Sequence, residues 1–185
     1  MTPDSVPQAL PRHISQLRCG LGWDAQMESV LDLDMAVLAL EANGQLATGK
    51  ADMIYAGHPR HPSGAIKLLN DNLTGEGDGD DEELFISLPK LPANITQLLF
   101  VVSIDGGEEQ QQDFSQTENA FWRILDHASQ DLLWQCSLSN PVWHSVTILF
   151  VAALEYREAQ WWIVPYLNPS PQKNLNALLH QYLPV

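Results

Sequence analysis

Basic residues, cysteines and long apolar runs are all scarce in this sequence. Only nine residues are Lys or Arg, against 23 Asp or Glu, which gives a formal net charge of −14 at pH 7. Nucleic-acid binding needs clustered positive charge, so we expect no nucleic-acid partner. The longest apolar run, ILFVAAL at 148–154, is far too short to span a bilayer, so we expect no direct membrane insertion.

The N-terminal segment, MTPDSVPQALPRH, lacks the apolar core of a signal peptide. We therefore predict a cytoplasmic protein, with residues 1–12 as a flexible leader and residues 13–185 as a single domain. The two cysteines, Cys19 and Cys136, fit no metal-binding or redox spacing. In a reducing compartment they are expected to be buried free thiols.

The rest of the composition favours a folded, β-rich domain. Hydrophobic residues make up 45% of the chain, which is enough for a sizeable core. Short segments rich in β-branched and aromatic residues are separated by turn signals such as ANGQ and GHPRHPSG. Strands at this spacing predict an all-β fold, an antiparallel β-sandwich. The predicted strands are 31–40, 51–55, 65–69, 83–88, 97–104, 119–125, 132–138, 145–156 and 160–167.

Three segments carry more specific predictions. Residues 145–156 are apolar on both faces and should form a central strand. A short helix is an alternative for residues 119–125. A C-terminal α-helix is predicted from four residues spaced i, i+3, i+4 and i+7, namely Leu175, Leu178, Leu179 and Tyr182.

Residues 71–84, DNLTGEGDGDDEEL, hold seven carboxylates, three glycines and no basic residue. A phosphate-binding loop is excluded because the segment has no G-K-[ST] and its carboxylates would repel phosphate. An EF-hand is excluded because neither Asp71 nor Asp78, taken as the first position, places Gly where the template needs it. Two interpretations stay open: a solvated acidic loop without function, and a long loop that binds calcium.

Charge repulsion favours the calcium interpretation. Each close pair of carboxylates costs roughly 1 kcal/mol at ~4 Å in water and about 4 kcal/mol near a protein surface. Ca²⁺ takes about six to eight oxygen ligands, and glycines let the backbone wrap closely around an ion. The surplus of carboxylates favours Ca²⁺ over Mg²⁺, which wants fewer protein ligands.

A second acidic cluster supports the same site. Asp32 and Asp34 stand two residues apart on a predicted strand, so both should point to one face, about 6.6 Å apart. Asp24, in GLGWD, could join them from a neighbouring segment. The alternating residues should point into the core; they are Leu31, Leu33, Met35 and Val37.

Other features support weaker hypotheses. His58 and His61 could hold a transition metal, but no third ligand is evident, and such pairs are usually surface residues. The WW pair at 161–162 should send one ring to the core and the other to a groove or partner surface. Two alternative functions use the acidic cluster: metal-dependent hydrolysis, and calcium-dependent binding to a membrane surface. Since no nucleophile–base arrangement is legible, we expect no enzyme.

Four motifs resemble those of the bacterial TerD-type tellurium-resistance domain family. They are GLGWD, DLDMAV, DNLTGEGDGDDE and FSQTENAFWRI, they occur in the family's order, and the similarity runs from about residue 14 to about residue 182. The resemblance implies a cytoplasmic, calcium-binding β-sandwich linked to tellurite and general stress resistance, with two ions expected. It also implies action through partners, including other tellurium-resistance proteins and a membrane-bound one. The implied metal ligands are Asp24, Asp32, Asp34, Asp71, Asn72, Asp78, Asp80, Asp81 and Glu82.

The sequence departs from the family pattern mainly in one loop. The family's IHDAE reads IDGGE at 104–108, so its Asp is replaced by Gly106, and the Arg that follows it is Gln110. Near the last strands the usual GELYR reads ALEYR, which puts Leu154 where Glu is common. Because the loop at 105–112 is altered, the resemblance does not establish that this chain contacts the same partner or ligand as better-known members.

Overall fold

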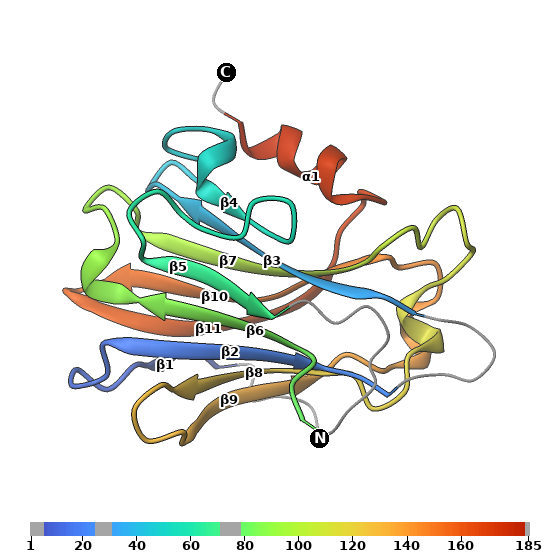
Figure 1. Ribbon diagram of the computed structural model, residues 1–185, viewed down its shortest axis with the longest axis horizontal. Coiled ribbons are helices and arrows are strands. Elements are labelled where there is room, and N and C mark those ends of the chain that lie inside the picture. Colours follow the sequence, from blue (N-terminus) through green and yellow to red (C-terminus); the bar gives the residue numbers. More distant parts are fainter. Residues whose placement is uncertain (1–5, 25–30, 71–78, 184–185) are drawn as a thin grey trace.

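The structure is a computed structural model that describes residues 6–24, 31–70 and 79–183. Two antiparallel sheets pack face to face (Figure 1). Sheet A has the order β1-β11-β10-β7-β3-β4 and sheet B the order β5-β6-β2-β8-β9. The predicted antiparallel β-sandwich is therefore confirmed. Among the described residues, no helix is long and apolar enough to cross a membrane.

The elements of each sheet have the following bounds. Sheet A contains β1 (Gln8–Ala9), β3 (Leu33–Leu40), β4 (Met53–Ile54), β7 (Gln97–Ile104), β10 (Ile148–Arg157) and β11 (Gln160–Pro169). Sheet B contains β2 (Gln16–Gly22), β5 (Ile66–Asn70), β6 (Glu82–Ser87), β8 (Phe121–Asp126) and β9 (Leu132–Ser137). Short 3-10 helices, η1 to η4, span Lys50–Asp52, Leu88–Lys90, Phe114–Gln116 and Pro141–Trp143.

Most predicted strands match these elements. The strand predicted at 97–104 has those bounds in the structure, and β10 lies between β7 and β11, as expected for a central strand. Residues 121–126 form β8, so the helical alternative for that segment is wrong. In the segment predicted at 51–55, Met53 and Ile54 form β4, the two residues before them belong to η1, and Tyr55 forms an isolated β-bridge with His58.

The described part of the predicted leader is ordered. Gln8 and Ala9 pair with Ile163 and Trp162 of β11, and Leu10 is only 2% exposed. The Leu10 amide also donates to the Trp161 carbonyl at 2.8 Å. The prediction of a flexible leader is therefore wrong for this part. The sequence alone did not show that β11 has a free edge with which residues 8 and 9 can pair. Residues 1–5 lie outside the described residues.

Alternation along the strands separates two apolar layers. The main core lies between the sheets and includes Leu33, Met35 and Val37 of β3, as predicted. A second layer lies on the outer face of sheet A, where the helix α1 (Leu175–Tyr182) covers Ala36 and Leu38. The helix runs along that face (Figure 1). The predicted C-terminal helix is confirmed, and Leu178 and Leu179 are its buried residues.

A β-bulge interrupts the alternation of β10. The register shifts between Phe150 and Ala152 against both neighbouring strands. Val151 and Ala152 consequently both belong to the core between the sheets, whereas a regular strand would send one of them outward. Beyond the bulge the inward residues have even numbers, Leu154 and then Tyr156.

Candidate metal site

Asp32 and Asp34 lie at the start of β3, on the outer face of sheet A. Asp34 pairs in register with Ser103 of β7, and the next outward residue of β3 is Ala36 of the layer under α1. Both aspartates are half-buried, while Leu31 and Leu33 are buried in the core. The predicted common orientation of the two carboxylates is therefore confirmed: both line one cavity.

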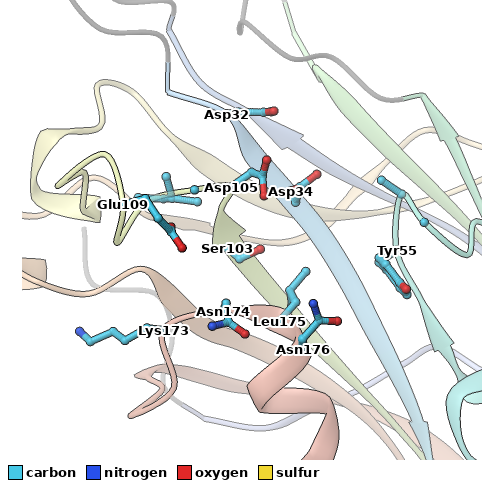
Figure 2. Close-up of a pocket in the computed structure, with 15 residues that line it drawn as sticks. Asp32, Asp34, Tyr55, Ser103, Asp105, Glu109, Lys173, Asn174, Leu175 and Asn176 are labelled. Carbon is cyan, nitrogen blue, oxygen red and sulfur yellow. The ribbon is translucent and has the colours of Figure 1, made fainter.

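This cavity, which we call the acidic pocket, has a volume of about 360 Å³. Two further carboxylates, Asp105 and Glu109, come from the loop after β7, and the start of α1 forms another wall (Figure 2). Ser103, Asn174 and Asn176 add oxygen atoms to the lining. The positive end of the helix dipole faces this negative pocket, which stabilises the carboxylates.

The pocket carries the right type of ligands for a hard cation. Its lining holds carboxylate, hydroxyl and amide oxygens, without a His or Cys among the described residues, and Ca²⁺ prefers such oxygens. In the part of the chain described, however, no three Asp, Glu, His or Cys side chains are close enough together to hold a metal ion. Further ligands would have to come from outside the described residues, where Asp71, Asn72 and Asp78 lie.

Asp80 lies on the opposite side of the molecule. Its carboxylate accepts a hydrogen bond from Arg123 Nε at 2.9 Å and is 5% exposed. It rests on Gly20, where a Cβ atom would approach its carboxyl carbon to 2.3 Å. Gly20 and Arg123 are register partners on the outer face of sheet B. Because the sandwich separates Asp34 from Asp80, one ion cannot bind both.

The carboxylates of Asp81 and Glu82 each accept a hydrogen bond from a backbone amide of another segment. Asp81 Oδ2 accepts from the Trp23 amide at 3.0 Å, and Glu82 Oε2 accepts from the Met35 amide at 2.7 Å. Glu82 is fully buried and ties β6 of sheet B to β3 of sheet A. One oxygen of each carboxylate is therefore engaged in holding the fold together.

Asp24 is the most exposed of the described acidic candidates. Its carboxylate accepts from Asn119 Nδ2 at 2.6 Å, and its amide donates to the Glu118 carbonyl at 3.0 Å. These bonds fix GLGWD to the FSQTENAFWRI segment, two of the motifs noted in the sequence. The structure does not place Asp24 in the lining of the acidic pocket.

Comparison with known proteins decides the family. The model of the TerD domain matches residues 8–182. This chain belongs to the TerD domain family. Relatives include "Stress response protein SCP2" of Bacillus subtilis (strain 168), 35% identical over 92% of this chain and 90% of that protein. "Tellurium resistance protein TerD" of an Alcaligenes species is 35% identical over 71% of this chain and 69% of that protein.

Solved structures share the fold of this TerD domain. A homologue of telluride resistance protein (TerD), SCO6318 from Streptomyces coelicolor A3(2), superposes with a TM-score of 0.73 at 18% identity. The match covers 88% of this chain and 94% of that one. A protein of unknown function, SAV2460, superposes with a TM-score of 0.72 at 20% identity over the same shares.

The loop that departs from the TerD pattern forms part of the acidic pocket. The Asp105 amide donates to the Asp32 carbonyl at 2.9 Å, which fixes the loop beside the two β3 carboxylates. Gly106 has a φ of 61°, a conformation that favours glycine. Asp105 and Glu109 were absent from the predicted ligand set. The acidic residues between 105 and 109 are visible in the sequence and could have indicated these ligands. Only the pairing of β3 with β7 shows that the end of β7 lies beside Asp34.

Asp113 anchors the far end of this loop. Its carboxylate accepts from the Ser115 hydroxyl at 2.5 Å and from the amides of Ser115 at 3.0 Å and Ser145 at 2.8 Å, and His144 Nδ1 lies 3.3 Å away. Burial alone would raise the pKa of Asp113, but these hydrogen bonds outweigh it and lower the pKa below the usual 3.8. The ionised carboxylate therefore stabilises the loop that carries Asp105 and Glu109.

The two histidines of HPRH have different surroundings. His61 is 5% exposed, with Nε2 at 3.1 Å from Asp52 Oδ1 and Nδ1 at 2.8 Å from Ser63 Oγ. The Ser63 amide also donates to Nδ1, so this ring nitrogen acts as an acceptor and Nε2 carries the proton toward Asp52. The usual surface position assumed for such a pair is wrong for His61, which instead joins the η1 segment to the turn before β5.

Proposed function

We propose that this chain is a calcium-binding, non-enzymatic protein of a tellurite-resistance or general stress-response system. It acts in the cytoplasm by calcium-dependent binding to partners, which include other tellurium-resistance proteins and a membrane-bound one. The observation that carries the proposal is the acidic pocket, where Asp32, Asp34, Asp105 and Glu109 line one cavity. The names of relatives support the physiological setting, since they include tellurium resistance and stress response proteins.

The composition of the pocket favours ion binding over catalysis. A catalytic acid–base pair needs one carboxyl whose pKa is raised by apolar walls. Here the walls supply further carboxylates, amides and the hydroxyls of Ser103 and Tyr55, with Lys173 as the single basic residue of the described lining, and such oxygens suit a cation that binds many of them. The hydrolase alternative therefore gains no support from the lining.

Calcium should stabilise the fold by mass action. One site that binds the folded state alone contributes roughly 2.7 kcal/mol at a hundredfold excess of free ion over Kd. For a domain of this size the Tm should rise by about 5–10 °C. Scanning calorimetry of chelator-stripped protein, with and without calcium, measures this shift, and magnesium should give a smaller one.

Matched variants locate the ion. Asp32→Asn combined with Asp34→Asn should abolish most of the calcium-induced shift. Asp131→Asn is the control, because Asp131 is exposed in the turn between β8 and β9. If millimolar calcium leaves the Tm of the wild-type protein unchanged, calcium binding is wrong. If the shift survives in the double variant, the ion binds away from Asp32 and Asp34, and the acidic residues of 71–84 become the next candidates.

A further inference from the structure

An apolar groove lies at the end of the sandwich away from the acidic pocket. Its larger part, about 430 Å³, and a smaller part of about 140 Å³ share Arg12, Ile14, Tyr156 and Trp161 in their linings. The β10–β11 hairpin and the segment after β6 meet there (Figure 1). Ile95 precedes β7 and Asp105 follows it, so about eight strand residues, roughly 25 Å, separate the groove from the pocket.

Two aromatic rings form the ridge between the two parts of this groove. Tyr156 and Trp161 are register partners whose ring centroids lie 5.3 Å apart, and Tyr156 is 47% exposed. The other walls are mostly aliphatic and include Leu91, Pro92 and Ile95. Trp161 faces the inner side of its strand, as Ile163 does, yet it stays half-buried because the sandwich ends there.

The described lining of the groove carries no negative charge. Among the described residues that line it none is acidic, and Arg12 alone is charged, in a chain of net charge −14. Arg18, Arg123 and Arg157 each form an ion pair, whereas Arg12 forms none with a described residue and donates only to the Ala159 carbonyl at 3.3 Å. The Trp161 Nε1–H and the Tyr156 hydroxyl likewise have no partner within the described ranges.

The backbone around the groove is already paired. The Tyr156 amide donates to the Thr96 carbonyl, and the Trp161 carbonyl accepts from the Leu10 amide, both at 2.8 Å. An incoming segment therefore cannot extend sheet A here by strand addition. A polyproline II segment needs no such ladder: its prolines pack between aromatic rings, and its free carbonyls accept from side-chain donors.

We propose that this groove binds an extended, proline-containing peptide segment of a partner protein that carries a carboxylate beside its prolines. The prolines would pack against Tyr156 and Trp161, and the carboxylate would pair with Arg12. A groove walled by Leu91, Pro92 and Ile95 fits an extended peptide better than a flat membrane surface. This inference goes beyond the proposed calcium function and does not depend on it.

The test uses the full chain, ¹⁵N-labelled, in chelator. The probe is a synthetic peptide with a Pro-Leu-Pro-Pro core flanked by glutamates, with matched peptides that carry lysine flanks or an alanine core. The glutamate peptide should shift the Trp161 indole signal and the Tyr156 amide signal, and the matched peptides should bind more weakly. Arg12→Glu should weaken binding of the glutamate peptide by about tenfold and favour the lysine peptide.

Controls separate the groove from other surfaces. Tyr156→Ala should remove binding, while Tyr166→Ala, at an exposed tyrosine outside the groove, should leave it intact. The proposal is overturned if millimolar glutamate peptide shifts neither signal, or if the lysine or alanine-core peptide binds equally well. Phosphatidylglycerol vesicles that shift the groove signals when the peptide does not would instead identify a membrane-binding surface. The chelator keeps every outcome independent of calcium.

Discussion

Replacing Glu82 should show whether the buried carboxylate holds the sandwich together. Glu82→Met keeps the approximate size of the side chain but leaves the Met35 amide without its acceptor. An unsatisfied buried donor costs about 1–3 kcal/mol. For a domain of this size the Tm should fall by roughly 2–12 °C. Glu82→Gln keeps a neutral acceptor at the same place, so its loss should be the smaller of the two.

The neighbouring residue provides a matched control. Glu83 pairs with Arg18 on the outer face of sheet B, where the guanidinium is 30% exposed. Such a pair contributes about 0–1 kcal/mol, so Glu83→Met should change stability little. Urea unfolding of all three variants gives the free energies directly, provided that the denaturant slope m is unchanged.

The same experiment in chelator and in calcium tests the reasoning. A hydrogen bond to Met35 predicts the same loss for Glu82→Met under both conditions. If the variant matches the wild-type protein in chelator and is weaker only in calcium, the structural assignment is refuted. Glu82 would then act as an ion ligand, as the sequence resemblance implies.

Two further predictions concern other buried groups. Asp113→Asn should lower the free energy of unfolding above pH 4, because the ionised carboxylate that accepts the hydrogen bonds is lost. The difference in this free energy between variant and wild type should vanish as the pH falls below the lowered pKa of Asp113. Urea unfolding between pH 3 and pH 7 measures it, and an unchanged difference at pH 3 would contradict the prediction. Burial raises the pKa of Cys136 to about 12 and that of Cys19 still higher. Neither thiol should therefore react with a thiol reagent until the protein unfolds. Rapid labelling of the native protein would contradict this prediction.

Local periodicity was enough to predict most strands but missed β2. Its inward residues Leu17, Cys19 and Leu21 alternate as a strand should, and all three are fully buried. Its outward positions include Gly20 and Gly22, which resemble turn residues in the sequence. In the structure these glycines make room: the Asp80 carboxylate rests on Gly20, and the Gly79 carbonyl and the Phe121 ring lie against Gly22.

For the acidic residues too, some positions follow from local sequence and others only from contacts between distant strands. That Asp32 and Asp34 share a face follows from the period of a strand. That Asp80 pairs with Arg123, 43 positions away, follows from the alignment of β2 with β8, which no short motif contains. The contiguous acidic string therefore suggested one ligand set. Pairing of the strands instead divides its described members between the outer face of sheet B, where Asp80 and Glu83 lie, and the buried interior, where Asp81 and Glu82 lie.

The bulge in β10 makes the groove sensitive to the length of this strand. Because Val151 and Ala152 both point inward, every later residue of β10 is out of phase with the residues before the bulge. Deleting Val151 would remove the bulge but leave Phe150 opposite Val101 and Ala152 opposite Phe100, so the distal half of the strand would keep its orientation. Deleting a residue beyond the bulge, such as Ala153, would instead place Arg157 opposite Trp161 in the position of Tyr156, so a single deleted codon there would remove one binding surface while the acidic pocket at the other end stayed intact.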